Sequence, residues 1–238
     1  MKKDKIAVII PCFKVKNKIN YVVKKCLKYF DAIICVDDCC PQKSGLYIKK
    51  KFKRFRKVKV LFNKKNMGVG GAVKTGYKFV LKKNYKFIVK LDGDGQMDPG
   101  DYKKLIYPIK KGNALYTKGN RFFYQNYFKK SPKIRYFGNL ILTIVSKFTT
   151  GYWGISDPLN GYTCIEMNTL RKLNFSQARN DFFFETSMIF LLKNLNIKIE
   201  DVKVKISYGG EISNFKIYNE LSRFIYLHFK YFLMRIFK

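Results

Sequence analysis

Runs of apolar residues alternate with segments of helical spacing along the first half of the chain. The apolar runs that predict strands are residues 5–10, 32–38, 58–62 and 86–94. Helical spacing follows the first run over 17–30, and further helices are expected after the second and third runs. Because these strands are apolar at successive positions, the pattern predicts an α/β fold whose mostly parallel sheet is covered by helices on both faces.

The second half of the chain is less regular. Its predicted elements are helices over 133–150, 181–195 and 218–238, a turn and strand over 157–167, and a strand over 197–206. No repeat or Ser/Pro-rich linker separates them, so we expect one domain over 1–210 and a basic, aromatic helical tail over 211–238. The sequence contains no run of about 20 uncharged apolar residues, so we predict no membrane span.

Positive charge dominates the composition. The 49 Lys+Arg and 16 Asp+Glu give a formal net charge of +33, which favours a negative partner such as nucleic acid, a phosphorylated ligand or an anionic membrane. The lysines are spread over the whole chain, so we expect much of the excess to be solvated surface. No nucleic-acid-binding motif is present, and we expect no nucleic-acid partner.

The cysteines exclude two common small-protein scaffolds. None of the six forms a CxxC pair and His228 is the single histidine, so neither a structural zinc site nor a disulfide framework is expected. We expect most of these cysteines to serve as small apolar residues in a reducing cytosol. The N-terminal apolar run meets Pro11 quickly, which predicts a first strand rather than a signal peptide.

Acidic residues follow two of the predicted strands, where a parallel sheet binds its ligands. Asp92, Asp94 and Gln96 are spaced two apart, so on an extended segment their oxygens would point to one side. Such hard oxygen ligands suit Mg²⁺ or Mn²⁺. The alternative is an acidic turn, and it does account for Asp98, which precedes Pro99 as a helix cap would.

Other candidate phosphate-binding groups are less specific. The segment 66–76, which contains Gly68, offers backbone N–H groups at a helix start, either as an anion cradle or as a tight turn that permits close packing. Arg121 and Arg135 lie among aromatic residues, and arginine is the usual residue for bidentate phosphate contacts. Asp38, after the second strand, would accept hydrogen bonds from a nucleoside or cap a helix.

Six motifs follow one another in an order that a known family shares. They are "VIIPCFK", "VDDCCP", "NMGVGGAVKTG", "LDGDGQMDP", "GNRF" and "SDPLNGYTCI". With them, the chain from about Ile6 to Val204 resembles the family 2 glycosyltransferases, and most closely the branch that makes polyprenyl-phosphate sugars, the dolichyl-phosphate mannose synthase type.

The resemblance implies a GT-A fold and an inverting hexosyltransferase that uses Mg²⁺ or Mn²⁺. The donor would be a nucleotide sugar (GDP- or UDP-hexose) and the acceptor a polyprenyl phosphate. Carried over by position, the residues for donor and metal are Pro11, Phe13, Asp38, Gly68, Asp92, Gly93, Asp94 and Gln96, with the metal held by Asp92, Asp94 and Gln96.

On the acceptor side, the resemblance implies that Arg121 and Arg135 bind the acceptor phosphate. Asp157 would orient the acceptor or act as a base, and Glu185 lies where the fold often places another functional acid. Together with Asp94, the resemblance therefore implies Asp157, Arg121 and Arg135 as the catalytic set.

The chain also departs from the family pattern. Val15 replaces a glutamate, Cys39 and Cys40 replace Gly-Ser, Val69 replaces a lysine and Gly93 replaces an alanine. Because the metal acids Asp92 and Asp94 and both arginines remain, we expect an active enzyme, with an altered donor or acceptor preference. The alternatives are a transferase of the same fold that acts on a sugar hydroxyl in surface-polysaccharide assembly, and a non-catalytic lipid-phosphate or nucleic-acid-binding protein.

The tail bears on localisation. Its basic, aromatic character is typical of a helix at a membrane interface, so we expect a cytoplasmic protein that is peripheral on the cytosolic face of a membrane. The region 135–153 would lie against the bilayer too. Alternatively, both stretches pack on the core, on a membrane-anchoring partner subunit or on a second copy of the chain.

Overall fold

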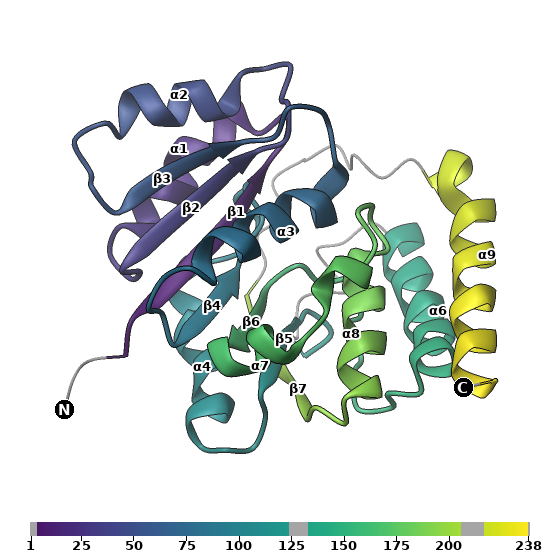
Figure 1. Cartoon of the computed structure of the whole chain (residues 1–238). Coiled ribbons are helices and arrows are strands. Elements are labelled where there is room, and N and C mark those ends of the chain that lie inside the picture. The colour runs from purple at the N-terminus through teal and green to yellow at the C-terminus, as the bar shows by residue number, and fades with distance from the viewer. Residues whose placement is uncertain (1–3, 124–132, 206–216, 238) are drawn as a thin grey trace.

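The computed structural model describes residues 4–123, 133–205 and 217–237, and in this part the chain forms a seven-stranded sheet of order β3-β2-β1-β4-β6-β5-β7 (Figure 1). The strands are β1 (Ile6–Cys12), β2 (Ala32–Asp37), β3 (Val58–Phe62), β4 (Phe87–Lys90), β5 (Tyr116–Asn120), β6 (Thr163–Glu166) and β7 (Ile199–Lys203). Only β6 runs antiparallel to its neighbours in this sheet, which confirms the mostly parallel arrangement expected from the sequence.

Helices cover both faces of the sheet (Figure 1). They are α1 (Lys16–Cys26), α2 (Ser44–Lys51), α3 (Gly68–Val80), α4 (Tyr102–Lys110), α6 (Lys133–Thr150), α7 (Met167–Lys172), α8 (Phe184–Asn194) and α9 (Ile217–Ile236), with 3₁₀ turns at η1 (Pro99–Asp101) and η2 (Phe175–Gln177). Alternate residues of β1 face opposite ways. Val8 and Ile10 pack with α1, α2 and α4, whereas Ala7 and Ile9 pack with α3, α7 and α8.

Most predicted elements are confirmed, but one strand boundary differs and one strand was not predicted. The strand predicted over 86–94 ends at Lys90, because the chain then turns with Gly95 at a φ of +79°. Asp92 and Asp94 therefore lie on this turn and not on an extended strand. The sequence pattern also missed β5, whose central Lys118 is polar but fully buried.

The C-terminal helix α9 packs along α6 (Figure 1). Phe224, Leu227 and Tyr231 bury their rings and methyl groups against α8 and the residue before it. Burial among these groups lowers the pKa of His228 to about 4, and its Nδ1 lies 2.8 Å from Oγ1 of Thr149. One face of the tail thus packs on the core, as one alternative proposed. The predicted domain boundary at 210 lies outside the described residues and stays a prediction.

Candidate active site

The carboxyl ends of β1, β2 and β4 bring together residues that are far apart in the sequence. The backbone N–H of Asp38 donates to the carbonyl of Cys12 over 3.1 Å, and a Cβ on Gly93 would lie 3.2 Å from the carbonyl oxygen of Pro11. The half-buried Phe13 follows β1 at the same edge. The structure therefore brings the predicted nucleoside-binding residues and the Asp92–Asp94 turn into one place.

Gly93 is explained by crowding. A Cβ at this position would meet Cδ1 of Ile19 at 3.1 Å and Cγ2 of Val15 at 3.3 Å. Val15 and Gly93 are both departures from the family pattern, and they are neighbours in space. Because glycine has no Cβ, position 93 leaves room for the side chains that pack around it.

The two acids after β2 have different surroundings. Asp37 accepts hydrogen bonds from the N–H groups of Cys40 (2.8 Å) and Gly45 (2.5 Å), so it holds the turn that leads into α2. Asp38 accepts from Nδ2 of Asn63 (2.7 Å) and from the N–H of Met67 (2.9 Å). Asp38 therefore ties the end of β2 to the glycine-rich segment, and its predicted contact with a nucleoside stays a prediction.

Asp92 is paired with a buried lysine. Nζ of Lys90 lies 2.9 Å from Oδ1 of Asp92 and 2.8 Å from Oε1 of Glu185, while only 2% of the Lys90 side chain is exposed. Burial lowers the pKa of Lys90, but the two carboxylates outweigh that effect and hold the pKa above the ordinary lysine value. Lys90 thus compensates part of the negative charge of the acids for which the sequence predicted only a metal ion as partner.

The oxygen ligands offered by the side chains of this turn fit a divalent cation. Asp92 and Asp94 are both partly exposed, and Oδ1 of Asp94 accepts the N–H of Gln96 over 3.0 Å. Gln96 itself is buried. In the described part of the chain no three His, Cys, Asp or Glu side chains cluster into a complete metal site. A Mg²⁺ or Mn²⁺ ion at these carboxylates would therefore take further oxygen ligands from a bound diphosphate or water, as Mg²⁺ usually does.

Arg121 and Asp157 form a buried bidentate pair. Nε and Nη2 of Arg121 lie 2.7 Å from Oδ2 and Oδ1 of Asp157, and the backbone N–H of Arg121 donates to Oδ2 over 2.9 Å. Asp157 is 1% exposed. This carboxylate therefore fixes the arginine, an arrangement that favours an orienting role over that of a base. Arg135 lies in the first turn of α6, and its side chain is outside the described part of the structure.

Glu185 lies between two buried lysines. Its Oε2 is 3.3 Å from Nζ of Lys118, which also donates to the carbonyl oxygen of Asn160. Burial lowers the pKa of Lys118 in spite of the nearby Glu185 and Asp157 carboxylates. Glu185 was predicted from the sequence as a functional acid, whereas Lys90 and Lys118 were not predicted as site residues. A lysine inside an otherwise apolar strand was the available signal, but in so basic a chain it did not stand out.

The glycine-rich segment around Gly68 serves close packing in this structure. The N–H groups of Gly70 and Gly71 donate to the carbonyl oxygen of Asn180 (2.8 and 3.2 Å), and the N–H of Gly68 donates to Oδ1 of Asn66 (2.9 Å). A Cβ on Gly70 would overlap the carbonyl oxygen of Arg179. These contacts favour the tight-turn interpretation, and donor binding by Gly68 stays a prediction.

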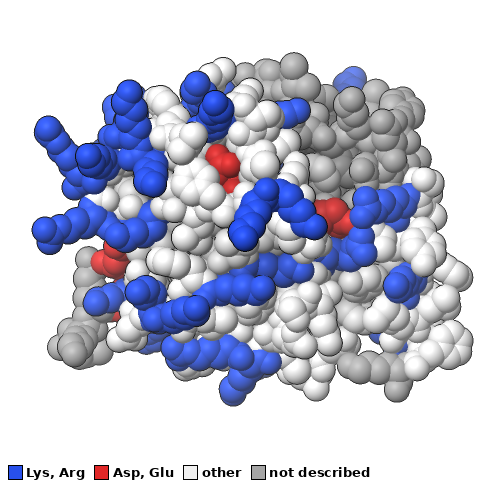
Figure 2. All heavy atoms as spheres, turned by 45° about the horizontal axis from the view of Figure 1, so that its top comes forward, with Lys and Arg blue, Asp and Glu red and all other residues white. Residues whose placement is uncertain are grey.

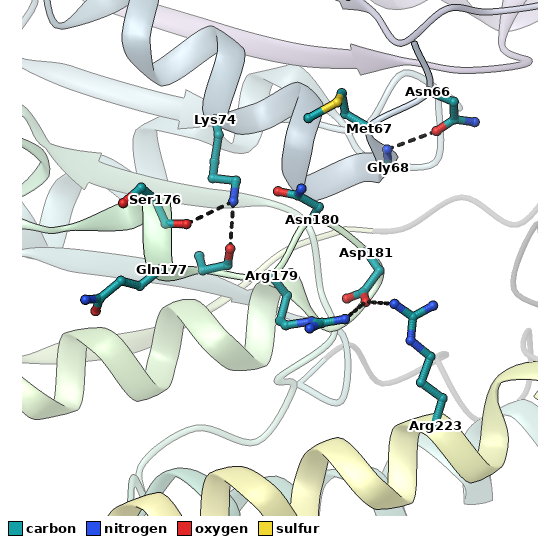
Figure 3. A pocket seen from close by; sticks show the side chains of 11 residues that line it. Asn66, Met67, Gly68, Lys74, Ser176, Gln177, Arg179, Asn180, Asp181 and Arg223 are labelled. Carbon is teal, nitrogen blue, oxygen red and sulfur yellow. Dashed lines mark hydrogen bonds and ion pairs between the residues drawn. The ribbon is translucent and has the colours of Figure 1, made fainter.

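A polar cavity of about 510 Å³ opens beside this segment (Figure 3). Lys74 reaches into it from α3 and donates to the Ala178 carbonyl oxygen over 2.7 Å. Asp181 bridges Arg179 (2.6 Å) and Arg223 of α9 (2.8 Å). The cavity wall therefore links the tail helix to the loop before α8.

Lysine and arginine side chains spread over much of the face shown in Figure 2, with few acids between them. The dispersed distribution agrees with the solvated basic surface that the sequence predicted. Such a surface raises the local concentration of phosphorylated ligands without specifying one of them.

Gly161 allows the segment that follows Asp157 to approach Asp92 and Lys90 closely. A Cβ on this residue would overlap Oδ2 of Asp92 and Nζ of Lys90. We expect Gly161→Ala to displace both side chains and to lower turnover on the order of 100-fold, because a misplacement of about 1 Å can cost that much. Initial rates and thermal unfolding would measure the effect.

Gly138→Ala in α6 is the matched control, since nothing lies within 4 Å of its Cβ position. This variant should keep its activity and gain about 0.5–1 kcal/mol in stability, as Gly→Ala changes in helices do. A Gly161→Ala enzyme that is as active as the Gly138→Ala enzyme would contradict the contact with Asp92.

Comparison with known proteins identifies the family. The model of the Glycosyl transferase family 2 matches residues 7–187, and the chain belongs to this family. It is 26% identical over 216 residues to the UDP-N-acetylglucosamine–dolichyl-phosphate N-acetylglucosaminyltransferase of Methanococcus voltae, covering 85% of this chain and 86% of that protein. It is 22% identical over 173 residues to the undecaprenyl-phosphate mannosyltransferase of Micrococcus luteus, covering 72% and 70%.

Solved structures agree on the fold. The glucosyl-3-phosphoglycerate synthase of Mycobacterium tuberculosis, in a crystal structure with Mn²⁺ and UDP-glucose, superposes with a TM-score of 0.68 at 14% identity, covering 93% of this chain and 76% of that one. The fold is therefore GT-A, as the resemblance implied. With its family and its relatives, the protein is a hexosyltransferase that is related to polyprenyl-phosphate sugar transferases.

Proposed function

We propose that this enzyme transfers a hexose, with inversion, from a nucleoside-diphosphate sugar to a polyprenyl phosphate. Asp92 and Asp94 would hold Mg²⁺ or Mn²⁺, and a cation bound there would supply Lewis-acid stabilisation for the nucleoside diphosphate leaving group. Arg121, oriented by Asp157, binds the acceptor phosphate. The names of the relatives from Methanococcus and Micrococcus support this acceptor.

The contacts of Asp157 and Glu185, the two carboxylates that could serve as a general base for a hydroxyl acceptor, carry the proposal. Asp157 is held by three N–H donors of Arg121, and Glu185 lies between Lys90 and Lys118. A hydroxyl acceptor needs a general base within reach of its proton. A phosphate is already ionised near neutral pH, so it requires no such base. The occupied carboxylates thus favour a phosphate acceptor over the sugar hydroxyl that remains the alternative.

A matched pair of acceptors tests this proposal. The wild-type enzyme, Mn²⁺ and GDP- or UDP-hexose would be incubated with a polyprenyl phosphate or with the polyprenol that lacks the phosphate, and the lipid-linked sugar would be quantified. Product is expected from the phosphate only. Faster transfer to the polyprenol or to an oligosaccharide hydroxyl would refute the phosphate acceptor.

A lipid acceptor calls for a membrane contact, and we propose that α6 and α9 provide it. In the described residues no helix is long and apolar enough to cross a bilayer. The exposed apolar side chains of the two helices are Phe137, Leu140, Ile141, Ile144, Phe148, Ile225, Tyr226, Phe229, Met234 and Ile236. This α6–α9 face, together with the basic residues around it, is suited to the interface of an anionic membrane.

Flotation with anionic vesicles would test the contact on the full chain. The double variant Ile225→Ser, Phe229→Ser should float at least about tenfold less than wild type, because each buried side chain contributes about 1.5–3 kcal/mol. The control Leu46→Ser, Phe55→Ser changes two side chains that are also exposed but lie in α2 and after it. Equal flotation of both variants, or self-association through the α6–α9 face, would exclude the membrane contact.

A further inference from the structure

Six charged side chains form a continuous buried ladder between the two halves of the proposed site. In order they are Asp92, Lys90, Glu185, Lys118, Asp157 and Arg121. Asn160 joins Lys118 to Asp157, because its carbonyl oxygen accepts from Lys118 and its Nδ2 lies 3.3 Å from Oδ2 of Asp157. The three acids and three bases balance, so the ladder carries no formal net charge.

The sheet places the two lysines side by side. Lys90 of β4 and Lys118 of β5 both pair in register with Thr163 of the intervening β6. Side chains at such positions lie on the same face of a sheet, and α8 covers this face with Glu185 from its first turn. The geometry therefore aims both ammonium groups at one carboxylate.

Stability alone does not account for such a ladder. Replacing a buried ion pair by apolar residues of similar volume is often neutral or stabilising. Lys90, Lys118 and Glu185 are nevertheless almost fully buried, whereas the side chain of Asp92 is 29% exposed at one end. At one end, the row of buried charges thus reaches the partly exposed carboxylate of Asp92, on the side of the proposed donor site.

We propose that Lys90 and Glu185 are positioning residues for the donor metal. Glu185, fixed by Lys118, holds the Lys90 ammonium against Oδ1 of Asp92. This contact sets both the orientation and the effective charge of the carboxylate that the metal meets. Glu185 acts through Lys90 and exchanges no proton with the substrate. The inference rests on the proposed metal site at Asp92 and Asp94.

Opposite changes in metal affinity test the inference. Calorimetric titration of the full chain with Mn²⁺, in the absence of acceptor, should show about tenfold tighter binding for Lys90→Met, because a positive charge near the metal is removed. Glu185→Gln should bind Mn²⁺ several-fold more weakly, since Lys90 then pairs with Asp92 alone. The double variant Lys90→Met, Glu185→Gln should bind Mn²⁺ about as tightly as Lys90→Met alone, because Glu185 acts through Lys90 and the effects of residues in contact are not additive.

Lys86→Met is the matched control for loss of one lysine charge near β4. Lys86 is exposed and pairs with Asp4 over 3.0 Å, so its replacement should leave the Mn²⁺ affinity unchanged. If Lys90→Met and Glu185→Gln both weaken Mn²⁺ binding in step with a loss of thermal stability, the residues are merely structural and the inference is wrong. A flat titration of the wild-type protein would overturn the proposed metal site and this inference together.

Kinetics separate positioning from acid–base catalysis. We expect Glu185→Gln to lower kcat by about tenfold or less and to keep the shape of the pH–rate profile, whereas loss of a general base costs about 10²–10⁴-fold. Lys90→Met should lower kcat without raising the donor KM. A lost limb in the Glu185→Gln pH profile would make Glu185 the base and refute the inference, even where Mn²⁺ binding follows the expected signs.

Discussion

Replacing Asp94 by asparagine is expected to reduce hexose transfer by at least about 100-fold, because the metal would lose a charged ligand needed to stabilise the leaving diphosphate. Asp94 is partly exposed, and its Oδ1 accepts the backbone N–H of Gln96 over 3.0 Å. Initial rates of nucleoside diphosphate release in saturating Mn²⁺ would measure the loss.

Asp98→Asn is the control on the same turn. Oδ1 of Asp98 accepts the N–H of Gly100 over 3.0 Å and caps η1, and an asparagine oxygen can do the same. This variant should keep a rate near that of wild type. Undiminished turnover by Asp94→Asn would remove the metal from the proposed mechanism.

Asp157→Asn is expected to lower the free energy of unfolding by about 3–5 kcal/mol, as the loss of one partner of a buried ion pair does. The change leaves the Arg121 guanidinium buried, 8% exposed, beside a neutral amide. Urea denaturation at pH 7 would measure the loss, and weaker acceptor binding should accompany it because Arg121 is no longer held in place.

Asp181→Asn provides the comparison. Its partners Arg179 and Arg223 have side chains that are 32% and 51% exposed, so solvent screens the interaction. The loss there should stay below about 1 kcal/mol. If both variants lose the same stability, burial does not increase the energetic contribution of the Arg121–Asp157 pair, and the expected loss for Asp157→Asn is refuted.

The fold was largely predictable because burial leaves a local pattern in the sequence. Residues 32–36 are apolar at successive positions because β2 is covered on both faces. Helix α6 coincides with the predicted 133–150 because its amphipathic pattern is long. β5 was missed because its central lysine looks like a surface residue. Its burial depends on Glu185, which lies 67 residues further along the chain.

The candidate site was also predictable only in part. The order and spacing of short motifs pointed to Asp92, Asp94 and Arg121, since these residue types recur at the ends of particular strands. The motifs did not reveal which of these side chains are paired. Asp157 proved to be a partner of Arg121, and Asp92 a partner of Lys90.

Most of the strand and helix order, the acids at the strand ends and the family follow from local patterns, because periodicity and motif spacing are properties of the chain itself. Three features do not follow from local patterns. They are the packing role of the glycines at 68–71, the position of Glu185 between two lysines and the exposed α6–α9 face. Each depends on which groups the folded sheet brings within a few ångströms, and the charge balance of a buried group is set by those neighbours.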